Sequence, residues 1–303
     1  MEAQTTDTGE IPGTEPIEWG SDSEYGTLRD VLLCPPDNFR WLPTSVISKG
    51  TLESDRVYDA ELAGAQHREM VQAYDAAGVQ VHLLEPDPAL PYQVFARDSS
   101  VATPAGPVVT APAQPWRRGE HVPVIRFYRE AGIPIHNMIS AGTLEGGDVT
   151  IVEPGKLLIG NGEERTDTKA AAQLAGWFED LGWEVRVEPI PSHFVHIDVL
   201  VSVLAPKLVA VCTEVASYGL VKWLRDDLGC EILDISVEDA FGLGVNAMSL
   251  GDDRVISTKR SESLNERLRS LGLTVYDPDL EMFTLGGGGA HCLAQPLRRD
   301  RVG

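Results

Sequence analysis

Short apolar runs alternate with amphipathic segments along most of the chain, and their order repeats. The clearest joint is a glycine between a helical pattern and an apolar run. These joints read AAGVQVHLL at Gly78, EAGIPIHNM at Gly132, DLGWEVRVE at Gly182, DLGCEILDI at Gly229 and SLGLTVYDP at Gly272. A glycine that follows a helix readily takes the left-handed conformation that ends it, because it has no Cβ. The pattern therefore predicts five helices, each followed by a strand.

Two short runs of β-forming residues precede each of the last four helices. The predicted pairs are 99–103 with 107–110, 149–152 with 157–160, 199–204 with 208–212, and 247–250 with 254–257. Turn-forming tripeptides separate the two members of each pair, which is typical of hairpins. The sequence therefore predicts a ββαβ unit that recurs along the chain.

Five such units cannot each bury an apolar face alone, but a radial arrangement gives them one shared core. We predict an α/β fold, a five-bladed α/β-propeller of ββαβ units with pseudo-fivefold symmetry. The first unit has only the run 28–33 before its helix, and the run 291–297 could supply the missing strand. An open α/β sheet in two domains is the alternative. We assign residues 1–22, which are acidic and polar, to a flexible tail, and residues 23–303 to a single catalytic domain.

Composition narrows the class of partner. The formal net charge of −21 argues against nucleic acid and against anionic membranes, because both reward basic surfaces. A cationic small molecule suits this charge, although acidity also serves solubility alone. The four cysteines lack CxxC spacing, and no secretory segment or run of about 18 apolar residues is visible. We therefore expect a cytoplasmic protein, and leave open whether it forms a homodimer.

Polar clusters stand at the same place in successive units, where the first strand of each hairpin begins. They are Phe95-Ala96-Arg97-Asp98, Leu144-Glu145-Gly146-Gly147-Asp148, Val195-His196-Ile197-Asp198 and Gly244-Val245-Asn246. Equivalent positions of a radial repeat meet near its axis, so we expect these side chains to share one site. The glycine-rich run that ends at Cys292 follows the last unit and would re-enter the ring there.

These residue types suit an attack on a guanidinium group, which is planar, cationic and rich in N–H donors. Asp98 and Asp198 could hold it by charge-assisted hydrogen bonds. A Cys292 thiolate could attack its central carbon. His196 could protonate the departing amine and then activate water, and Glu145 could orient that histidine.

Each of these residues also has an ordinary structural interpretation. His196 could be a hydrogen-bonded core histidine, the Glu145–Asp148 segment a charged turn, and Cys292 a structural thiol. Too few residues follow Cys292 for the helix of a phosphate loop, so its glycines are expected to allow close backbone approach. A metal site of His196, Asp198 and Glu145 is a further alternative that we do not favour. Four clusters in register with one repeat favour a catalytic set without metal.

The motifs FARD, LEGGD, HID and GGGGAHC, in that order, resemble the guanidino-group modifying enzymes of the pentein fold. These include arginine deiminases, dimethylarginine dimethylaminohydrolases and amidinotransferases. The resemblance implies a covalent amidino-thioether on Cys292, with His196 as acid and base, and no metal or cofactor. It implies further roles for Glu145 as partner of His196, for Asp98 and Asp198 in guanidinium binding, for Arg165 and Arg117 in binding the substrate carboxylate, and for the recurrent Asn246 in substrate binding.

The same resemblance implies a hydrolase that turns arginine or a methylated arginine into a ureido product such as citrulline, releasing ammonia or an alkylamine. Asp198 departs from the dimethylarginine hydrolases, which generally lack that acid. The motif GGGGAHC also resembles that of amidinotransferases. Transfer of the amidino group from arginine to an amine therefore stays an alternative. A non-catalytic pentein binding module is another. The insertion 35–56 could be a lid or a packed surface loop.

Overall fold

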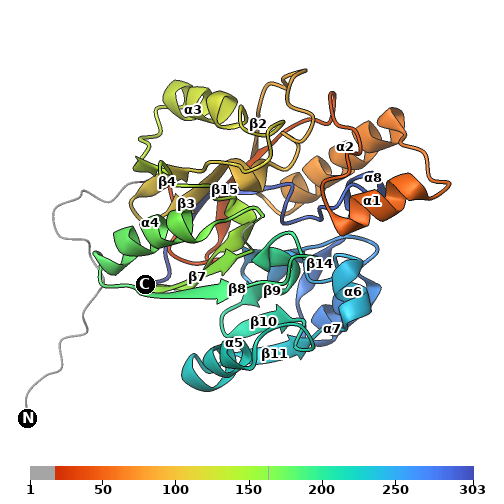
Figure 1. Ribbon diagram of the computed structural model, residues 1–303. Coiled ribbons are helices and arrows are strands. Elements are labelled where there is room, and N and C mark those ends of the chain that lie inside the picture. The colour runs from red at the N-terminus through yellow and green to blue at the C-terminus, as the bar shows by residue number, and fades with distance from the viewer. Residues whose placement is uncertain (1–17, 163) are drawn as a thin grey trace, which may run out of the picture.

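The computed structural model describes residues 18–162 and 164–303, and its strands form five small sheets of one plan (Figure 1). Each sheet has an antiparallel pair whose second strand also pairs in parallel with a third strand. From the first strand of the pair outward, the sheets are β15 (Gln295–Arg299)–β1 (Leu28–Leu33)–β2 (Gln80–Leu83), β3 (Ser100–Thr103)–β4 (Gly106–Val109)–β5 (Asn137–Met138), β6 (Val149–Glu153)–β7 (Lys156–Asn161)–β8 (Glu184–Pro189), β9 (Val201–Ala205)–β10 (Leu208–Val211)–β11 (Glu231–Asp234) and β12 (Met248–Gly251)–β13 (Arg254–Ile256)–β14 (Thr274–Tyr276).

A helical segment connects the second and third strands of each sheet. These segments are α2 (Ala60–Ala76), α3 (His121–Glu130), α4 (Thr168–Glu179), α5 (Tyr218–Lys222) with the π-helical turn η4 (Trp223–Asp227), and α7 (Glu262–Ser270). The predicted helix-ending glycines all have positive φ, from 68° at Gly229 to 91° at Gly272. Three shorter helices are α1 (Val46–Glu53), α6 (Val237–Phe241) and α8 (Glu281–Thr284). Within the described ranges, no helix has the length and apolar character needed to cross a membrane.

The first unit is completed from the C-terminus, as predicted, because β15 pairs antiparallel with β1. The strand begins at Gln295, later than the predicted 291–297. Residues up to Ala294 instead form turns, in which the Leu293 N–H donates to Gly289 O and the Ala294 N–H to His291 O. Neighbouring units meet through their inner strands, with β15 against β3 and β9 against β12. The α/β fold of five ββαβ units predicted from the repeat is confirmed.

Apolar side chains fill the space between each sheet and its helix. In the third unit, Leu174 and Phe178 of α4 pack against Leu157 and Ile159 of β7, and all four are buried. These helical positions are the apolar stripe expected from the 3.6-residue period. The stripe fixes the helix on the outer side of its sheet and leaves the ends of the inner strands for polar residues.

Most of the predicted N-terminal tail, residues 1–17, lies outside the described residues. Residues 18–22 pack against the domain: the Gly20 N–H donates to Leu297 O at 2.9 Å, and the Arg299 N–H donates to Gly20 O at 3.0 Å. Ser21 and Asp22 are buried. This anchoring carries the next residues of the chain, including Glu24, into the interior of the domain.

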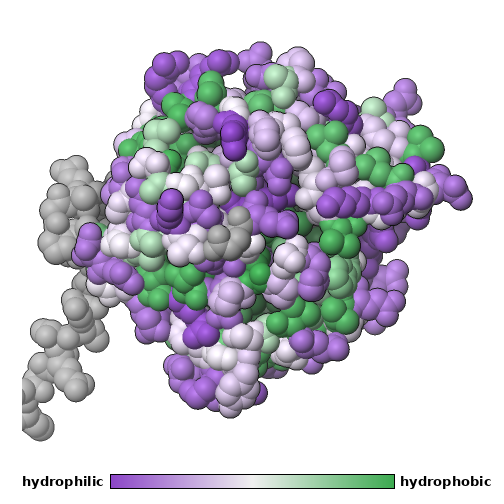
Figure 2. All heavy atoms as spheres, viewed as in Figure 1, coloured by the Kyte–Doolittle hydropathy of each residue, from purple (hydrophilic) through white to green (hydrophobic). Residues whose placement is uncertain are grey.

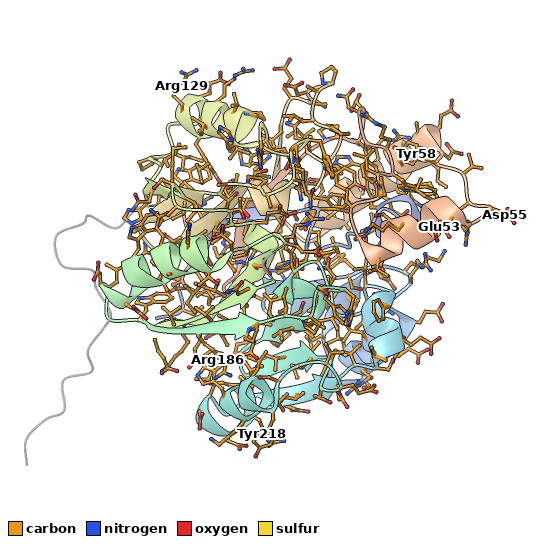
Figure 3. All side chains as sticks on the ribbon, in the orientation of Figure 1. Glu53, Asp55, Tyr58, Arg129, Arg186 and Tyr218 are labelled. Atoms are coloured by element: carbon orange, nitrogen blue, oxygen red, sulfur yellow. The ribbon has the colours of Figure 1, made fainter. Side chains whose placement is uncertain are left out.

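The insertion 35–56 is anchored on α8. The ring of Phe39 stacks on Phe283 with centroids 5.5 Å apart, and Trp41 Nε1 donates to Met282 O at 2.7 Å. Its helix α1 begins at a capping box formed by Ser45 and Ser48. Glu53 and Asp55 mark the far end of this segment, at the margin of the molecule (Figure 3). Apolar surface gathers below α1 and around α6 on the face shown in Figure 2, amid a largely hydrophilic exterior.

Candidate active site

Three short 3₁₀ turns carry the polar clusters predicted from the sequence. They are η1 (Ala96–Ser99), η2 (Gly146–Asp148) and η3 (Ile197–Val199), and each leads directly into an inner strand, β3, β6 or β9. The turns contact one another in sequence order, η1 with η2 and η2 with η3. The repeat therefore brings equivalent positions of three units together near the axis.

A narrow pocket opens at this place. Its polar and sulfur-containing lining comes from Asp98, Arg117, Arg165, His196 and Cys292, and its other lining residues include Thr44, Ser45, Tyr92, Phe95, Val195 and Gly286–Gly288. The structure thus brings five of the predicted site residues onto one surface. Glu145, Asp198 and Asn246 do not line the pocket; they are buried behind its wall.

One side of the site is a cluster of ion pairs, here named the arginine cluster: Asp98, Arg117, Glu120, Glu145, Arg165 and His196. At its centre Arg117 donates to Asp98 Oδ2 at 2.7 Å, to Glu120 at 2.8 and 2.9 Å, and to Glu145 Oε2 at 3.3 Å. Arg165 donates to the same Glu145 oxygen at 3.0 Å and to Thr44 O at 2.8 Å. The guanidinium of Arg117 is therefore fully engaged by protein acceptors.

His196 is held in this cluster by carboxylates. Its Nε2 lies 2.9 Å from Glu145 Oε2, and its Nδ1 lies 3.6 Å from Asp98 Oδ1. Burial alone disfavours the charged ring, but the nearby Asp98, Asp148 and Glu145 outweigh it and raise the pKa of His196 to about 9. Burial is likewise outweighed at Glu145, where Arg165 and Arg117 hold the pKa well below its usual range. A charged histidine beside an ionised carboxylate is the state expected of an acid.

The other side of the site surrounds the thiol and is named the nucleophile cluster: Cys292, Asp198, His291, Glu24 and Arg97. Cys292 Sγ lies 3.4 Å from Asp198 Oδ2, and His291 Nδ1 lies 2.8 Å from the same oxygen. Behind them His291 Nε2 is 3.9 Å from Glu24 Oε2, and Arg97 donates to Glu24 Oε1 at 2.8 Å. Burial, Asp198 and Asp98 together raise the pKa of the Cys292 thiol well above its usual range.

Asn246 and the glycine run fix the backbone at the nucleophile. Asn246 Oδ1 accepts the N–H of His291 at 3.1 Å and that of Cys292 at 3.2 Å. A Cβ added at Gly288 would overlap the Phe95 ring, and one added at Gly289 would overlap the Asn246 side chain. The expectation that these glycines allow close backbone approach is confirmed. Asn246, expected to contact substrate, instead supports the turn that presents Cys292.

Four residues of the two clusters were not predicted as site residues. Arg97 and His291 stand within the motifs FARD and GGGGAHC, and Glu120 stands three residues after the predicted Arg117. Their adjacency to a predicted site residue was a usable signal. No sequence signal marked Glu24, because it lies in a segment next to the predicted tail and outside the repeat.

Asp98, Glu145 and His196 also bring potential metal-ligand atoms within 4.8 Å of one another. Two guanidinium groups, from Arg117 and Arg165, already bind the carboxylate oxygens of this group. Cations in these positions compete with a metal for the same oxygens. We therefore assign no metal to this arrangement.

Comparison with known proteins agrees with this geometry. A family model described as N,N dimethylarginine dimethylhydrolase, eukaryotic, matches residues 44–299. An uncharacterized protein, YkgA of Bacillus subtilis, is 27% identical over 279 residues, which cover 91% of this chain and 94% of that protein. The N(G),N(G)-dimethylarginine dimethylaminohydrolase of Mycobacterium tuberculosis is 26% identical over 235 residues, covering 77% of this chain and 75% of that enzyme.

The fold is also that of a solved structure. A mutant of DDAH from Pseudomonas aeruginosa, complexed with citrulline, superposes with a TM-score of 0.75 at 22% identity, covering 89% of this chain and 99% of that one. At this identity the likeness establishes the fold. Together with the family model, this likeness confirms the pentein assignment made from the motifs.

Proposed function

The chain belongs to the family described as N,N dimethylarginine dimethylhydrolase, eukaryotic, and from this premise we propose that Cys292 hydrolyses arginine or a methylated arginine. The family makes the chain an enzyme that hydrolyses guanidino compounds. Our proposal concerns the nucleophile and the substrate. The products would be citrulline and either ammonia or an alkylamine.

The observation that carries the proposal is that Cys292 and His196 line one narrow pocket together with the carboxylate of Asp98. A nucleophile, a charged acid and an acceptor for N–H donors thus face the same small space. Glu145 bonds the Nε2 edge of His196 and leaves Nδ1 toward Asp98. This is the arrangement needed to protonate a nitrogen that departs from a carbon held at the thiol.

In the proposed reaction Cys292 is the nucleophile, and His196 acts first as acid and then as base. The Cys292 thiolate forms a C–S bond to the central guanidinium carbon, and the C–N bond to the departing nitrogen breaks as His196 gives that nitrogen a proton. The substrate carbon is then held as a thiouronium on Cys292. A water that loses a proton to His196 attacks this carbon, the C–S bond breaks, and a ureido product leaves.

The charge at the thiol favours a cationic substrate. Without substrate, burial and the two aspartates hold the Cys292 thiol protonated, because its pKa is raised well above the usual range. A guanidinium placed in the pocket would set a positive charge beside the sulfur and favour the thiolate. A neutral ester or amide would bring no such charge, which supports a guanidinium over those substrates.

The remote end of the substrate would lie toward Arg165. Arg165 lines both the pocket and an adjoining recess that Lys49, Glu164 and Ser192 also line. The cationic side chains of Arg165 and Lys49 suit an α-carboxylate there. Arg117, expected from the sequence to share that role, is committed to three protein carboxylates, so we assign the carboxylate to Arg165 alone.

The test is a substrate screen with the purified chain. Arginine, methylated arginines, agmatine and guanidino acids are incubated separately, and ureido product is quantified. We expect turnover of arginine or a methylarginine that is lost in Cys292→Ser and kept in Cys230→Ser, a buried cysteine outside the site. Turnover of none of these compounds, or full activity in Cys292→Ser, would overturn the proposal. Ornithine formation that requires an added amine would reveal amidino transfer instead.

A further inference from the structure

His291 has no role in the steps above, yet it is the titratable group packed most directly against the carboxylate at the nucleophile. The residue is 5% exposed and precedes Cys292 in the chain. Its Nδ1 lies 2.8 Å from Asp198 Oδ2, and its Nε2 faces Glu24 at 3.9 Å. Both ring nitrogens therefore point at carboxylates rather than at solvent.

The two oxygens of Asp198 have different surroundings. Oδ2 receives both His291 Nδ1 and the Cys292 thiol, the latter at 3.4 Å. Oδ1 is buried and has no hydrogen-bond partner among the described residues. A buried carboxylate oxygen without a donor is costly. The contact from His291 thus decides which oxygen meets the sulfur and which is left without a protein donor.

The charges around His291 favour its protonated form. Burial and the nearby Arg97 disfavour the charged ring, but Asp198 and Glu24 outweigh them and raise the pKa of His291. Burial disfavours the charged form of Asp198 as well, and the bond from His291 reverses this and lowers the pKa of Asp198. Arg97 pairs with Glu24, and protonated His291 pairs with Asp198. The formal charges of these four residues therefore sum to zero.

We propose that His291 is a positioning residue for the nucleophile: its proton holds Asp198 Oδ2 on the Cys292 sulfur and offsets the carboxylate charge there. This rests on the proposed function, in which Cys292 attacks the substrate. Without the histidine charge, the full negative charge of Asp198 would face the sulfur at 3.4 Å and oppose formation of the thiolate. His291 would thus act through Asp198, while His196 serves the departing nitrogen on the opposite side.

The experiment separates the hydrogen bond from the charge. In His291→Asn the side-chain amide keeps a donor near the Nδ1 position but carries no charge, and His291→Ala removes both. His67→Asn is the matched control, because His67 is buried outside the two clusters, against the insertion. Each purified protein is treated with iodoacetamide, which is neutral, and with 2-chloroacetamidine, which is cationic, and the rate of labelling at Cys292 is followed by peptide mass.

We expect the iodoacetamide rate at pH 7 to fall about tenfold in His291→Asn, which corresponds to a thiol pKa about one unit higher. The rate with 2-chloroacetamidine should fall less, because the uncompensated carboxylate attracts the cation. Turnover should show a lower kcat with no rise in KM. His67→Asn should leave both labelling rates unchanged.

A double-mutant cycle identifies the path of the effect. Because His291 is proposed to act through Asp198, His291→Asn should have no effect on labelling in an Asp198→Asn background. An equal slowing in both backgrounds, or unchanged labelling in His291→Asn with only a lower melting temperature, would overturn the inference. Selective labelling of Cys292 in the wild-type chain would leave the proposed function standing in that case. Retained turnover in Cys292→Ser would overturn the proposed function itself.

Discussion

The two sides of the active site use different means to keep charged groups buried. In the arginine cluster, two guanidinium groups donate several directional bonds to three carboxylates, and Arg117 alone contacts Asp98, Glu120 and Glu145. In the nucleophile cluster, a histidine and one arginine face two carboxylates and a thiol through single contacts. The first cluster is a network centred on Arg117, which binds Glu120 through two nitrogens, and the second is a short chain of single contacts.

The two aspartates of the site differ in how the protein binds their oxygens. Asp98 and Asp198 stand at equivalent positions of the repeat and were expected to hold the substrate guanidinium together. Asp98 is bound on both oxygens, by Arg117 Nη1 at 2.7 Å and by the Gly147 N–H at 3.0 Å. Asp198 keeps one oxygen without a protein donor. Equivalent positions of the repeat therefore differ in chemistry: Asp98 lines the pocket with both oxygens bound by the protein, and Asp198 lies against the thiol with one oxygen that has no donor among the described residues.

The largest effect is expected from Glu145→Gln. Glu145 binds His196 Nε2 and both arginines and is fully buried, so the amide would withdraw the charge that keeps the histidine protonated. Loss of a positioned acid lowers kcat by about 10²- to 10⁴-fold. Glu120→Gln is the control, because Glu120 binds Arg117 but not His196. Steady-state ureido formation measures both, and equal losses in the two variants would contradict the role of Glu145.

Next in size is a difference in stability between two buried arginines. Arg117→Met would leave three buried carboxylates without this cation. Removing one partner of a buried ion pair lowers the free energy of unfolding by about 3–5 kcal/mol. Arg97→Met should cost less, because Arg97 has one carboxylate partner and otherwise donates to the carbonyls of Gly146 and Val149. Urea unfolding of the two variants gives both free energies. A larger loss in Arg97→Met would mean that the nucleophile cluster is the more rigid side.

The repeat explains why so much of this could be predicted from the sequence. Glycine joints and hairpin runs are local signals, and their periodicity placed the clusters of FARD, LEGGD and HID at one axis. Each predicted hairpin is present within a residue or two of its expected bounds. The closure by β15 was also predictable, because the first unit lacked a strand.

Partner choice within the site could not be predicted in the same way. The sequence shows that Arg117 and Asp98 share a site, but not that the guanidinium turns inward to the protein's own carboxylates. Such a choice depends on side-chain rotamers and on the balance of buried charge, which no local pattern records. Glu24 was missed for a related reason, since it reaches the nucleophile cluster through the packing of residues 18–22.

The third prediction concerns the pH range over which His196 stabilises the fold. Its pKa is raised from 6.5 to about 9, because the carboxylates of the arginine cluster and Asp148 outweigh burial. The unfolded chain loses this proton near pH 6.5, so the contribution is fully present below that pH and is lost as pH rises through about 9. Its size is roughly 3 kcal/mol at 1.36 kcal/mol per unit. Urea unfolding of wild type and His196→Asn at pH 6 and pH 10 measures it, and a gap that widens at pH 10 would contradict the assignment.

The smallest effect distinguishes the two aspartates at the thiol. Asp198 lies 3.4 Å from the sulfur and opposes its ionisation more strongly than Asp98 does, and Asp98 has most of its charge offset by Arg117. Asp198→Asn should therefore speed labelling of Cys292 by iodoacetamide about tenfold at neutral pH, and Asp98→Asn by about threefold or less, because labelling follows the thiolate fraction. Both variants also remove a negative charge from the site of a cationic substrate, so turnover cannot separate them, whereas a neutral reagent can. Faster labelling in Asp98→Asn than in Asp198→Asn would mean that Asp98 controls the ionisation of the thiol. The arginine cluster would then hold the aspartate that governs Cys292, and the comparison of the two clusters would be reversed.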